Sequence, residues 1–290
     1  MNFEIKNLSP DNYEPVIDFY SKYGDRSFSW YEKKLKKEIM SGNIVGKVCF
    51  DNEKVIGAYL GRIQTLLCSP SLKAIQSIDT LIAPSHRGGK ILIRLAKEFY
   101  QFLKLNSYDV VYGLPNKKIE KFRYKFLNWK LLAPTYSFTV FIPIFLLRFI
   151  YYFFRFFLKK RMFFDYKNEK ENLIKNKLTI KNYTHENLAH GIYWINGQNN
   201  YFTFIGLFRI EKNLNIFQKF LALLVASSNS KGYFLKTYST SNSETADIFK
   251  PFSIKKKALN FSGCFLTNRA EILLKGSSFE FVEFDTFGLL

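Results

Sequence analysis

The stretch Ile78–Tyr100, IDTLIAPSHRGGKILIRLAKEFY, decides the fold of the first half of the chain. It begins with a short apolar run that is typical of a strand and that Pro84 ends. The turn Arg87–Lys90 then leads into a helical pattern, in which apolar residues recur at spacings of three and four from Ile91 onward. The stretch therefore predicts a strand, a glycine turn and an amphipathic helix that packs on a sheet.

The glycine turn is a candidate anion site. The first N–H groups of a helix lack partners, and the positive end of the helix dipole points the same way. Two common phosphate motifs are absent, because Lys90 is followed by Ile91 instead of the Ser or Thr of a P-loop, and no GxGxxG occurs. The residues alone leave two readings open, an anion site or a glycine turn without a ligand.

The surrounding pattern predicts a mixed α/β unit in the N-terminal half. A polar turn joins two alternating runs, as in a hairpin, and further apolar runs alternate with one more helical segment. The expected strands are Ile44–Phe50, Lys54–Gly61, Ala74–Ile82, Asp109–Leu114 and a pair around Trp129–Ile142, with a helix at Lys117–Leu127.

The C-terminal half begins after a polar linker, Asp165–Lys175, and shows no motif that carries chemistry. Its apolar periodicity predicts both strands and helices. We expect three parts: residues 1–142, residues 143–176 as a basic helix and linker, and residues 177–290 as a second α/β lobe. The expected strands are Lys177–Tyr183, Gly232–Tyr238, Ala258–Leu266 and Phe279–Phe287, and the expected helices are Glu186–Ile195 and Ile216–Ser227.

The most apolar window of the chain is Phe138–Leu158. Cationic and aromatic residues at helical spacing form one stripe on it, which suits a helix that lies in a membrane interface with its cations at lipid phosphates. A helix buried between two lobes and a true membrane span are the alternatives. The stripe consists of Arg148, Tyr152, Arg155 and Lys159.

The composition of the chain indicates which kinds of partner it could bind. The 290-residue chain carries a formal charge of +19 and is 47% hydrophobic, so we expect folded cores and an anionic partner, although a biased composition can also explain the charge. No nucleic-acid motif accompanies it. Three scattered cysteines and three histidines form no metal pattern, so we expect no metal site and a cytoplasmic protein. Peripheral binding to the anionic inner face of the membrane through residues 145–161 is a further expectation.

The string SIDTLIAPSHRGGKILIRLAKEFYQFLKLNSYDVVYGLPN, followed by FRYKFLNWKLL, resembles the GNAT acyl-CoA N-acyltransferases. It looks most like their larger two-lobed bacterial members, which are associated with surface-polysaccharide amino-sugar biosynthesis and read close to DTxVHPxYRGKGIF and GYDxVYGFPN, then LGW. The resemblance covers roughly Asn43–Phe141. It implies a mixed, mostly antiparallel sheet flanked by helices, with a second lobe that is GNAT-like or otherwise α/β.

The resemblance also implies a binding site for acetyl-CoA or another acyl-CoA. The backbone amides of the glycine loop would hold the pyrophosphate, and the end of the preceding strand would pair with the pantetheine arm. This chain departs from the family by reading Arg-Gly-Gly-Lys-Ile where the family has Arg-Gly-Lys-Gly-Ile. The residues so assigned are Leu81, Ile82, Arg87, Gly88, Gly89, Lys90, Ile91 and Asn116.

Three residues are candidates for the chemistry. An N-acyltransferase needs a base for the attacking amine and a proton donor for the leaving thiolate. Asp79 matches the family's Asp before the loop, so it would act as the base or orient the amine. Tyr124 matches the general proton donor, whereas the subgroup pattern places Glu120 at that position. Asn128 replaces the usual Gly before Trp129 and must tolerate a left-handed backbone.

The sequence thus predicts an N-acyltransferase that moves an acetyl or other short acyl group to a primary amine by direct transfer. The expected acceptor is an amino sugar on a nucleotide or lipid carrier. A peptidoglycan-bridge-type aminoacyl transferase that uses aminoacyl-tRNA is one alternative. A degenerate GNAT-like module that binds at the membrane surface without catalysis is the other.

Overall fold

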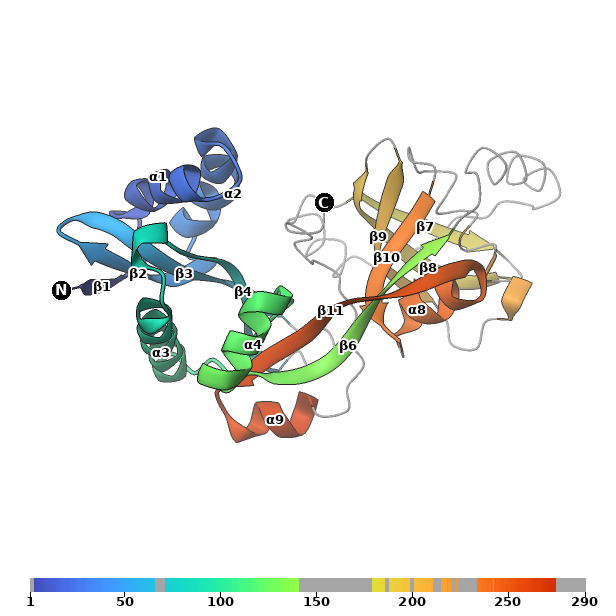
Figure 1. Cartoon of the computed structure of the whole chain (residues 1–290). Coiled ribbons are helices and arrows are strands. Elements are labelled where there is room, and N and C mark those ends of the chain that lie inside the picture. The colour runs from blue at the N-terminus through green and yellow to red at the C-terminus, as the bar shows by residue number, and fades with distance from the viewer. Residues whose placement is uncertain are drawn as a thin grey trace. The chain divides into compact units, whose positions relative to one another are not determined.

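The computed structural model describes residues 3–65, 71–140, 179–185, 188–198, 201–210, 215–217, 219–220, 223, 234–241 and 243–274 (Figure 1). The chain divides into two compact units. Unit 1 comprises residues 1–132 and 260–277, and unit 2 comprises residues 133–259 and 278–290. Residues 260–277, which we grouped with the second lobe from the sequence, belong to unit 1.

Unit 1 is a sheet in the order β1-β2-β3-β4-β5-β11, antiparallel except where β4 pairs with β5. Helices α1 and α2 cover one face of it, and α3 covers the other (Figure 1). This arrangement confirms the predicted fold class. The elements are β1 Glu4–Asn7, α1 Tyr13–Tyr23, α2 Phe28–Met40, β2 Ile44–Asp51, β3 Lys54–Thr65, β4 Lys73–Ile82, the 3₁₀ turn η1 Pro84–His86, α3 Lys90–Leu105, β5 Val110–Gly113, α4 Lys117–Phe126, β11 Ser253–Phe265 and α9 Asn268–Leu274. Of β11, residues 260–265 belong to unit 1 and residues 253–259 to unit 2.

The core of unit 1 forms where α3 packs against β2 and β3. Leu95, Phe99 and Leu103 are fully buried, at the spacing that the sequence pattern predicted. The predicted β2–β3 hairpin is also present. Asn52 and Glu53 at its tip both have positive φ, 46° and 69°, as a tight hairpin turn requires.

Unit 2 contains the strand order β6-β10-β9-β8-β7, in which only β9 and β10 run parallel. Strands β7, β10 and β11 confirm three predicted strands. The helix predicted at Glu186–Ile195 is wrong, because residues 188–195 lie in β8, which pairs with β7 on one side and β9 on the other. The elements are β6 Lys130–Val140, β7 Thr179–His185, β8 Leu188–Gln198, β9 Phe202–Ile210, β10 Phe234–Thr240, α8 Glu244–Phe249 and the 3₁₀ turn η2 Lys250–Phe252.

Several predictions fall outside the described residues. These are the basic helix and linker over 143–176, including the membrane-binding stretch 145–161, and the strand over Phe279–Phe287. Most of the helix expected at Ile216–Ser227 also lies outside them. Among the residues that the structure describes, no helix has the length and apolar character needed to span a bilayer.

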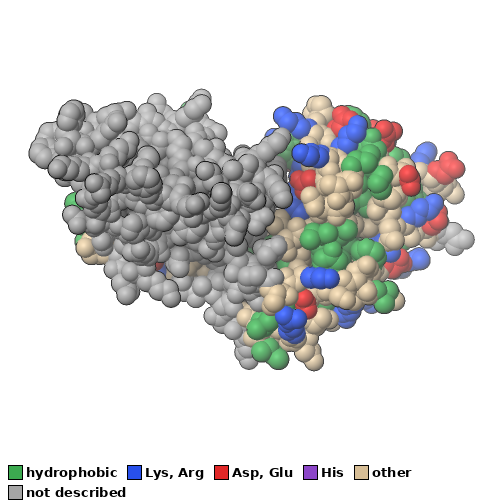
Figure 2. All heavy atoms as spheres, turned by 180° about the vertical axis from the view of Figure 1, so that it is seen from behind, with side chains coloured by type: hydrophobic (Ala, Val, Ile, Leu, Met, Phe, Trp, Pro, Cys, Tyr) green, Lys and Arg blue, Asp and Glu red, His purple; other side chains and the backbone are tan. Residues whose placement is uncertain are grey.

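The surface of unit 1 is mixed in charge on the face that Figure 2 shows. Lysine and arginine side chains alternate there with aspartates, glutamates and apolar side chains over the described residues. Lysines and arginines therefore form no single basic patch over the described residues of this face.

Asn128 supplies a first stability prediction. Its φ of 55° confirms the left-handed backbone expected between α4 and Trp129, and its neighbours Leu127 and Trp129 are 5% and 3% exposed. Replacing Asn128 with Ala should lower the free energy of unfolding by about 1 kcal/mol, because a β-carbon without a local hydrogen-bonding group is strained in this conformation. Asn128→Gly is the matched control and should be at least as stable as the wild type in urea denaturation; equal stability of the two variants would contradict the argument.

Candidate active site

The glycine loop lies between the turn η1, which follows β4, and α3. Gly88 and Gly89 have φ values of 148° and 91°, a region that side-chain-bearing residues rarely adopt. A Cβ at Gly88 would meet no described atom within 4 Å, so the loop leaves open space there, whereas a Cβ at Gly89 would lie 3.2 Å from Cε2 of Phe122. Arg87 anchors the loop by donating from Nε to the carbonyl oxygen of Ile82 at 3.3 Å.

Helix α3 begins directly after the two glycines, at Lys90. Its first N–H groups have no preceding turn to bond to, and they lie at the positive end of the helix. Ile91 is 7% exposed and packs in the core, so only its backbone can serve a ligand, while the side chains of Arg87 and Lys90 are exposed. The loop thus combines unpaired amides, open space and two cations, as an anion site requires.

Strand β4 separates from β5 after Gln76, within the strand and before the glycine loop. The two strands pair in parallel only from Ala74 to Gln76, and no pair beyond Gln76 occurs in the part of the chain that the structure describes. Strand β4 also carries a bulge, because its pairing with β3 shifts by one residue between Ser77 and Thr80. A bulge bends a strand and increases its twist. The edge of β4 that faces β5 is therefore open at Leu81 and Ile82, which remain paired with β3 on the other side.

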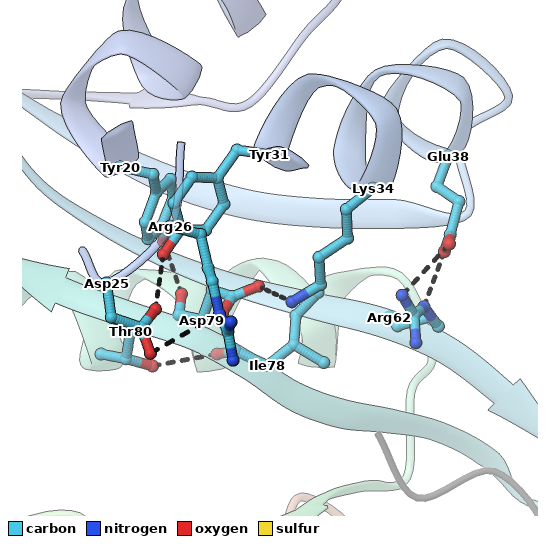
Figure 3. A network of polar contacts seen from close by, with 10 residues as sticks. All are labelled: Tyr20, Asp25, Arg26, Tyr31, Lys34, Glu38, Arg62, Ile78, Asp79 and Thr80. Atoms are coloured by element: carbon cyan, nitrogen blue, oxygen red, sulfur yellow. Dashed lines mark hydrogen bonds and ion pairs between the residues drawn. The ribbon is translucent and has the colours of Figure 1, made fainter. Parts of the chain in front are cut away.

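The bulge places Asp79 beneath α1 and α2 (Figure 3). Its Oδ2 lies 2.7 Å from Nζ of Lys34, and the two side chains are 23% and 7% exposed. Tyr20 donates from its hydroxyl to the backbone carbonyl of Asp79 at 2.6 Å. Lys34 of α2 thus holds the carboxylate and Tyr20 of α1 holds the backbone of Asp79, on the face of β4 that is opposite α3.

Two tyrosines beside Asp79 remain protonated at neutral pH. Burial, followed by the Asp79 charge, raises the pKa of Tyr20 well above its usual value. Burial and the nearby carboxylates Asp25 and Asp79 raise the pKa of Tyr31 to about 12. Both hydroxyls can therefore act only as neutral donors or acceptors around Asp79.

Tyr124 and Glu120 lie together on α4, away from the Asp79 network. The Tyr124 hydroxyl donates to Oε1 of Glu120 at 2.9 Å and lies 2.7 Å from Oγ of Ser262, while Asn260 donates from Nδ2 to the same Glu120 oxygen at 2.8 Å. Burial is the main reason that the pKa of Tyr124 is raised. Asn260 and Ser262 belong to β11, and no local motif could have linked them to α4.

Asn116 has a structural position. Its Oδ1 accepts the N–H of Ile119 at 3.1 Å, so it caps the first turn of α4.

The structure also shows a residue that the sequence analysis missed, Arg123. It is 6% exposed and stands in the apolar row Ile119, Arg123, Leu127 at helical spacing. An arginine on such a row was the signal available in the sequence.

The described residues give little support to metal-assisted catalysis or to a cysteine nucleophile. They contain no cluster of three or more His, Cys, Asp or Glu side chains that could hold a metal ion. Burial raises the pKa of both Cys49 and Cys264 to about 11, so these thiols remain protonated and poorly nucleophilic at neutral pH.

No protein-family model matches the chain, and the comparison with curated proteins likewise gives no match. Solved structures do match. A GCN5-related N-acetyltransferase from Kribbella flavida has a TM-score of 0.64 at 12% identity, covering 95% of this chain and 75% of its own. A conserved protein of unknown function from Enterococcus faecalis V583, a probable N-acyltransferase, has a TM-score of 0.65 at 10% identity and coverages of 92% and 73%.

A tandem GNAT protein from the clavulanic acid biosynthesis pathway also matches. Its TM-score is 0.54 at 7% identity, and the match covers 92% of this chain and 99% of that protein. At such identities the likeness concerns the backbone and not the chemistry. This chain has the GNAT fold, as the glycine-loop stretch predicted.

Proposed function

We propose that unit 1 binds acetyl-CoA or another acyl-CoA and transfers the acyl group to a primary amine. The observation that carries the proposal is one continuous edge, on which β4 bulges, leaves β5 and runs into the glycine loop at the start of α3. An exposed strand edge can hydrogen-bond an extended amide-containing chain, and the loop can bind an anion. A pantetheine arm that ends in a pyrophosphate needs both.

In this proposal the loop holds the pyrophosphate. The amides of Gly88, Gly89, Lys90 and Ile91 would donate to phosphate oxygens, and the exposed cations of Arg87 and Lys90 would add charge. The exchanged order of Gly89 and Lys90 relative to the family is compatible with this role. The φ of 91° at Gly89 favours glycine there, whereas Lys90 is the first residue of α3 and needs no special backbone.

Asp79 is the proposed base. It faces α1 and α2, the side opposite the α3 loop, so an amine could approach there while the arm lies along the edge of β4. Asp79 would take a proton as the amine nitrogen bonds to the thioester carbon and the carbon–sulfur bond breaks. Because Lys34 now pairs with this carboxylate, the incoming amine would have to replace the lysine ammonium.

Tyr124 is the proposed proton donor for the leaving thiolate, with Glu120 orienting its hydroxyl. The raised pKa keeps the phenol protonated until the thiolate forms. Direct transfer from the thioester suits the described residues better than a covalent intermediate, because Cys49 and Cys264 are buried thiols of raised pKa.

The proposed acceptor is an amino sugar on a nucleotide or lipid carrier, in keeping with the resemblance of the loop to surface-polysaccharide enzymes. Binding to an anionic membrane through residues 145–161 stays a prediction from the sequence. A thiol-release assay with nucleotide-linked amino sugars and simple amines tests the acceptor class. Release with aminoacyl-tRNA instead would favour the peptidoglycan-bridge alternative, and failure to bind acetyl-CoA would favour a non-catalytic module.

The glycine loop can be tested with a matched pair of variants. Gly88→Ala and Gly42→Ala both place a β-carbon at positive φ, 148° and 72°, where no described atom lies within 4 Å. Both should lose about 1 kcal/mol of stability from backbone strain. Only Gly88→Ala should raise the acetyl-CoA dissociation constant, by at least about tenfold in calorimetry, because its methyl group enters the space proposed for phosphate. Equal affinities for the two variants would refute the loop assignment.

The base can be tested by replacing one carboxylate. Asp79→Asn should lower kcat by about 10²-fold or more, since general base catalysis contributes that much, and should leave acetyl-CoA affinity unchanged. Asp25→Asn is the control, because Asp25 accepts from Tyr31 on the same face at 3.3 Å without contacting Lys34 in the described structure. If Asp79→Asn turns over like the control, Asp79 is not the base.

A further inference from the structure

Arg123 is a buried cation that the mechanism above does not use. It projects from α4 and is 6% exposed. Its Nη2 donates to Oγ of Ser77 at 2.9 Å and lies 3.4 Å from Oγ1 of Thr80. Both residues belong to β4, on either side of the bulge. The guanidinium is therefore fixed at the point where β4 leaves β5.

The shell around Arg123 is polar but neutral. The centre of the guanidinium lies 4.2 Å from the Trp129 ring and 5.7 Å from the Tyr59 ring. Hydrogen bonds continue from Ser77 to the Tyr59 hydroxyl at 3.2 Å and from there to Tyr100 at 2.9 Å, and Trp129 donates to Tyr100 at 2.7 Å. Burial raises the pKa of Tyr100 well above its usual value, so this phenol brings no negative charge.

No carboxylate partner for Arg123 occurs among the residues that the structure describes. No carboxylate oxygen of these residues lies within 4.0 Å of a nitrogen of the guanidinium. Arginine remains charged at any ordinary pH, and a desolvated charge is costly unless an opposite charge accompanies it. Aromatic faces and hydroxyl dipoles offset only part of that cost. The site therefore favours an anion.

The position of Arg123 indicates which part of a ligand would meet it. Nη1 lies 3.8 Å from the place that a β-carbon on Gly113 would occupy, so the guanidinium stands between β4 and β5, beside the last residue of β5. Ser77 comes five residues before Ile82 on β4. If the phosphates sit at the loop and the arm lies along Leu81 and Ile82, the far end of the donor, its acyl group, reaches Ser77 and Arg123.

We propose that Arg123 selects an acyl group that ends in a carboxylate, so that the donor is a dicarboxylic acid monothioester of CoA such as malonyl-CoA or succinyl-CoA. The inference rests on the proposed function, since it assumes that an acyl-CoA occupies the edge of β4. Nη2 already bonds the two hydroxyls, so Nη1 is the terminal nitrogen that remains for the ligand. A charge-assisted hydrogen bond from Nη1 to a carboxylate oxygen is about twice as strong as a neutral one.

Binding measurements test the inference without knowledge of the acceptor. Isothermal calorimetry on the full chain would compare malonyl-CoA with isovaleryl-CoA and succinyl-CoA with 4-methylpentanoyl-CoA, in which two methyl groups replace the carboxylate oxygens. The acidic member of at least one pair should bind at least about tenfold more tightly, because its charge pairs with a desolvated guanidinium. Arg123→Met should abolish this preference, and Arg123→Lys should retain part of it.

Arg94→Met controls for the overall charge. It removes one positive charge on α3 at an exposed site, where Arg94 pairs with Glu98, and should keep the preference in full. Binding of free CoA to Arg123→Met shows whether the glycine loop of that variant is intact. If Arg123→Met misfolds, the inference is tested by the affinities of the wild type and of Arg123→Lys for the two pairs of acyl-CoAs. Equal or tighter binding of the neutral members to the wild type overturns the inference and leaves the proposed function standing. Failure of CoA and of every acyl-CoA to bind overturns the proposed function itself.

Discussion

One extra residue in β4 sets the geometry of unit 1. Without the bulge between Ser77 and Thr80, β4 would follow a regular register with β3 and could continue beside β5. With it, the strand turns away after Gln76, exposes its edge and delivers the chain to the glycine loop. The positive φ values at Gly88 and Gly89 then lead directly into the first turn of α3. The glycine loop, the open edge of β4 and the position of the Asp79 carboxylate all depend on this one bulge.

Two charged groups lie beside the same bulge. Asp79 faces α1 and α2 and is neutralised by Lys34, whereas Ser77 and Thr80 face α4 and hold Arg123. An acidic group and a cation thus lie on opposite faces of one strand.

The sequence predicted the parts of this site that are local. The period of α3, the two glycines and the left-handed Asn128 are all short-range patterns, and the structure has them where they were expected. The partners of the candidate residues could not be predicted, because Lys34 lies 45 residues before Asp79 and Ser262 lies 138 residues after Tyr124. In unit 2, strand β8 was mistaken for a helix, since short apolar runs fit both periods until the pairing partners are known.

The return of β11 to unit 1 affects how the protein is made. β11 supplies the strand that pairs with β5, and the Asp109 carbonyl accepts the N–H groups of Leu266 and Thr267. Until about residue 267 has left the ribosome, β5 lacks its outer neighbour and Tyr124 lacks Ser262. Unit 1 begins first in the sequence but can be completed only near the end of synthesis, so its open β5 edge has to be kept from wrong pairing while unit 2 is being translated.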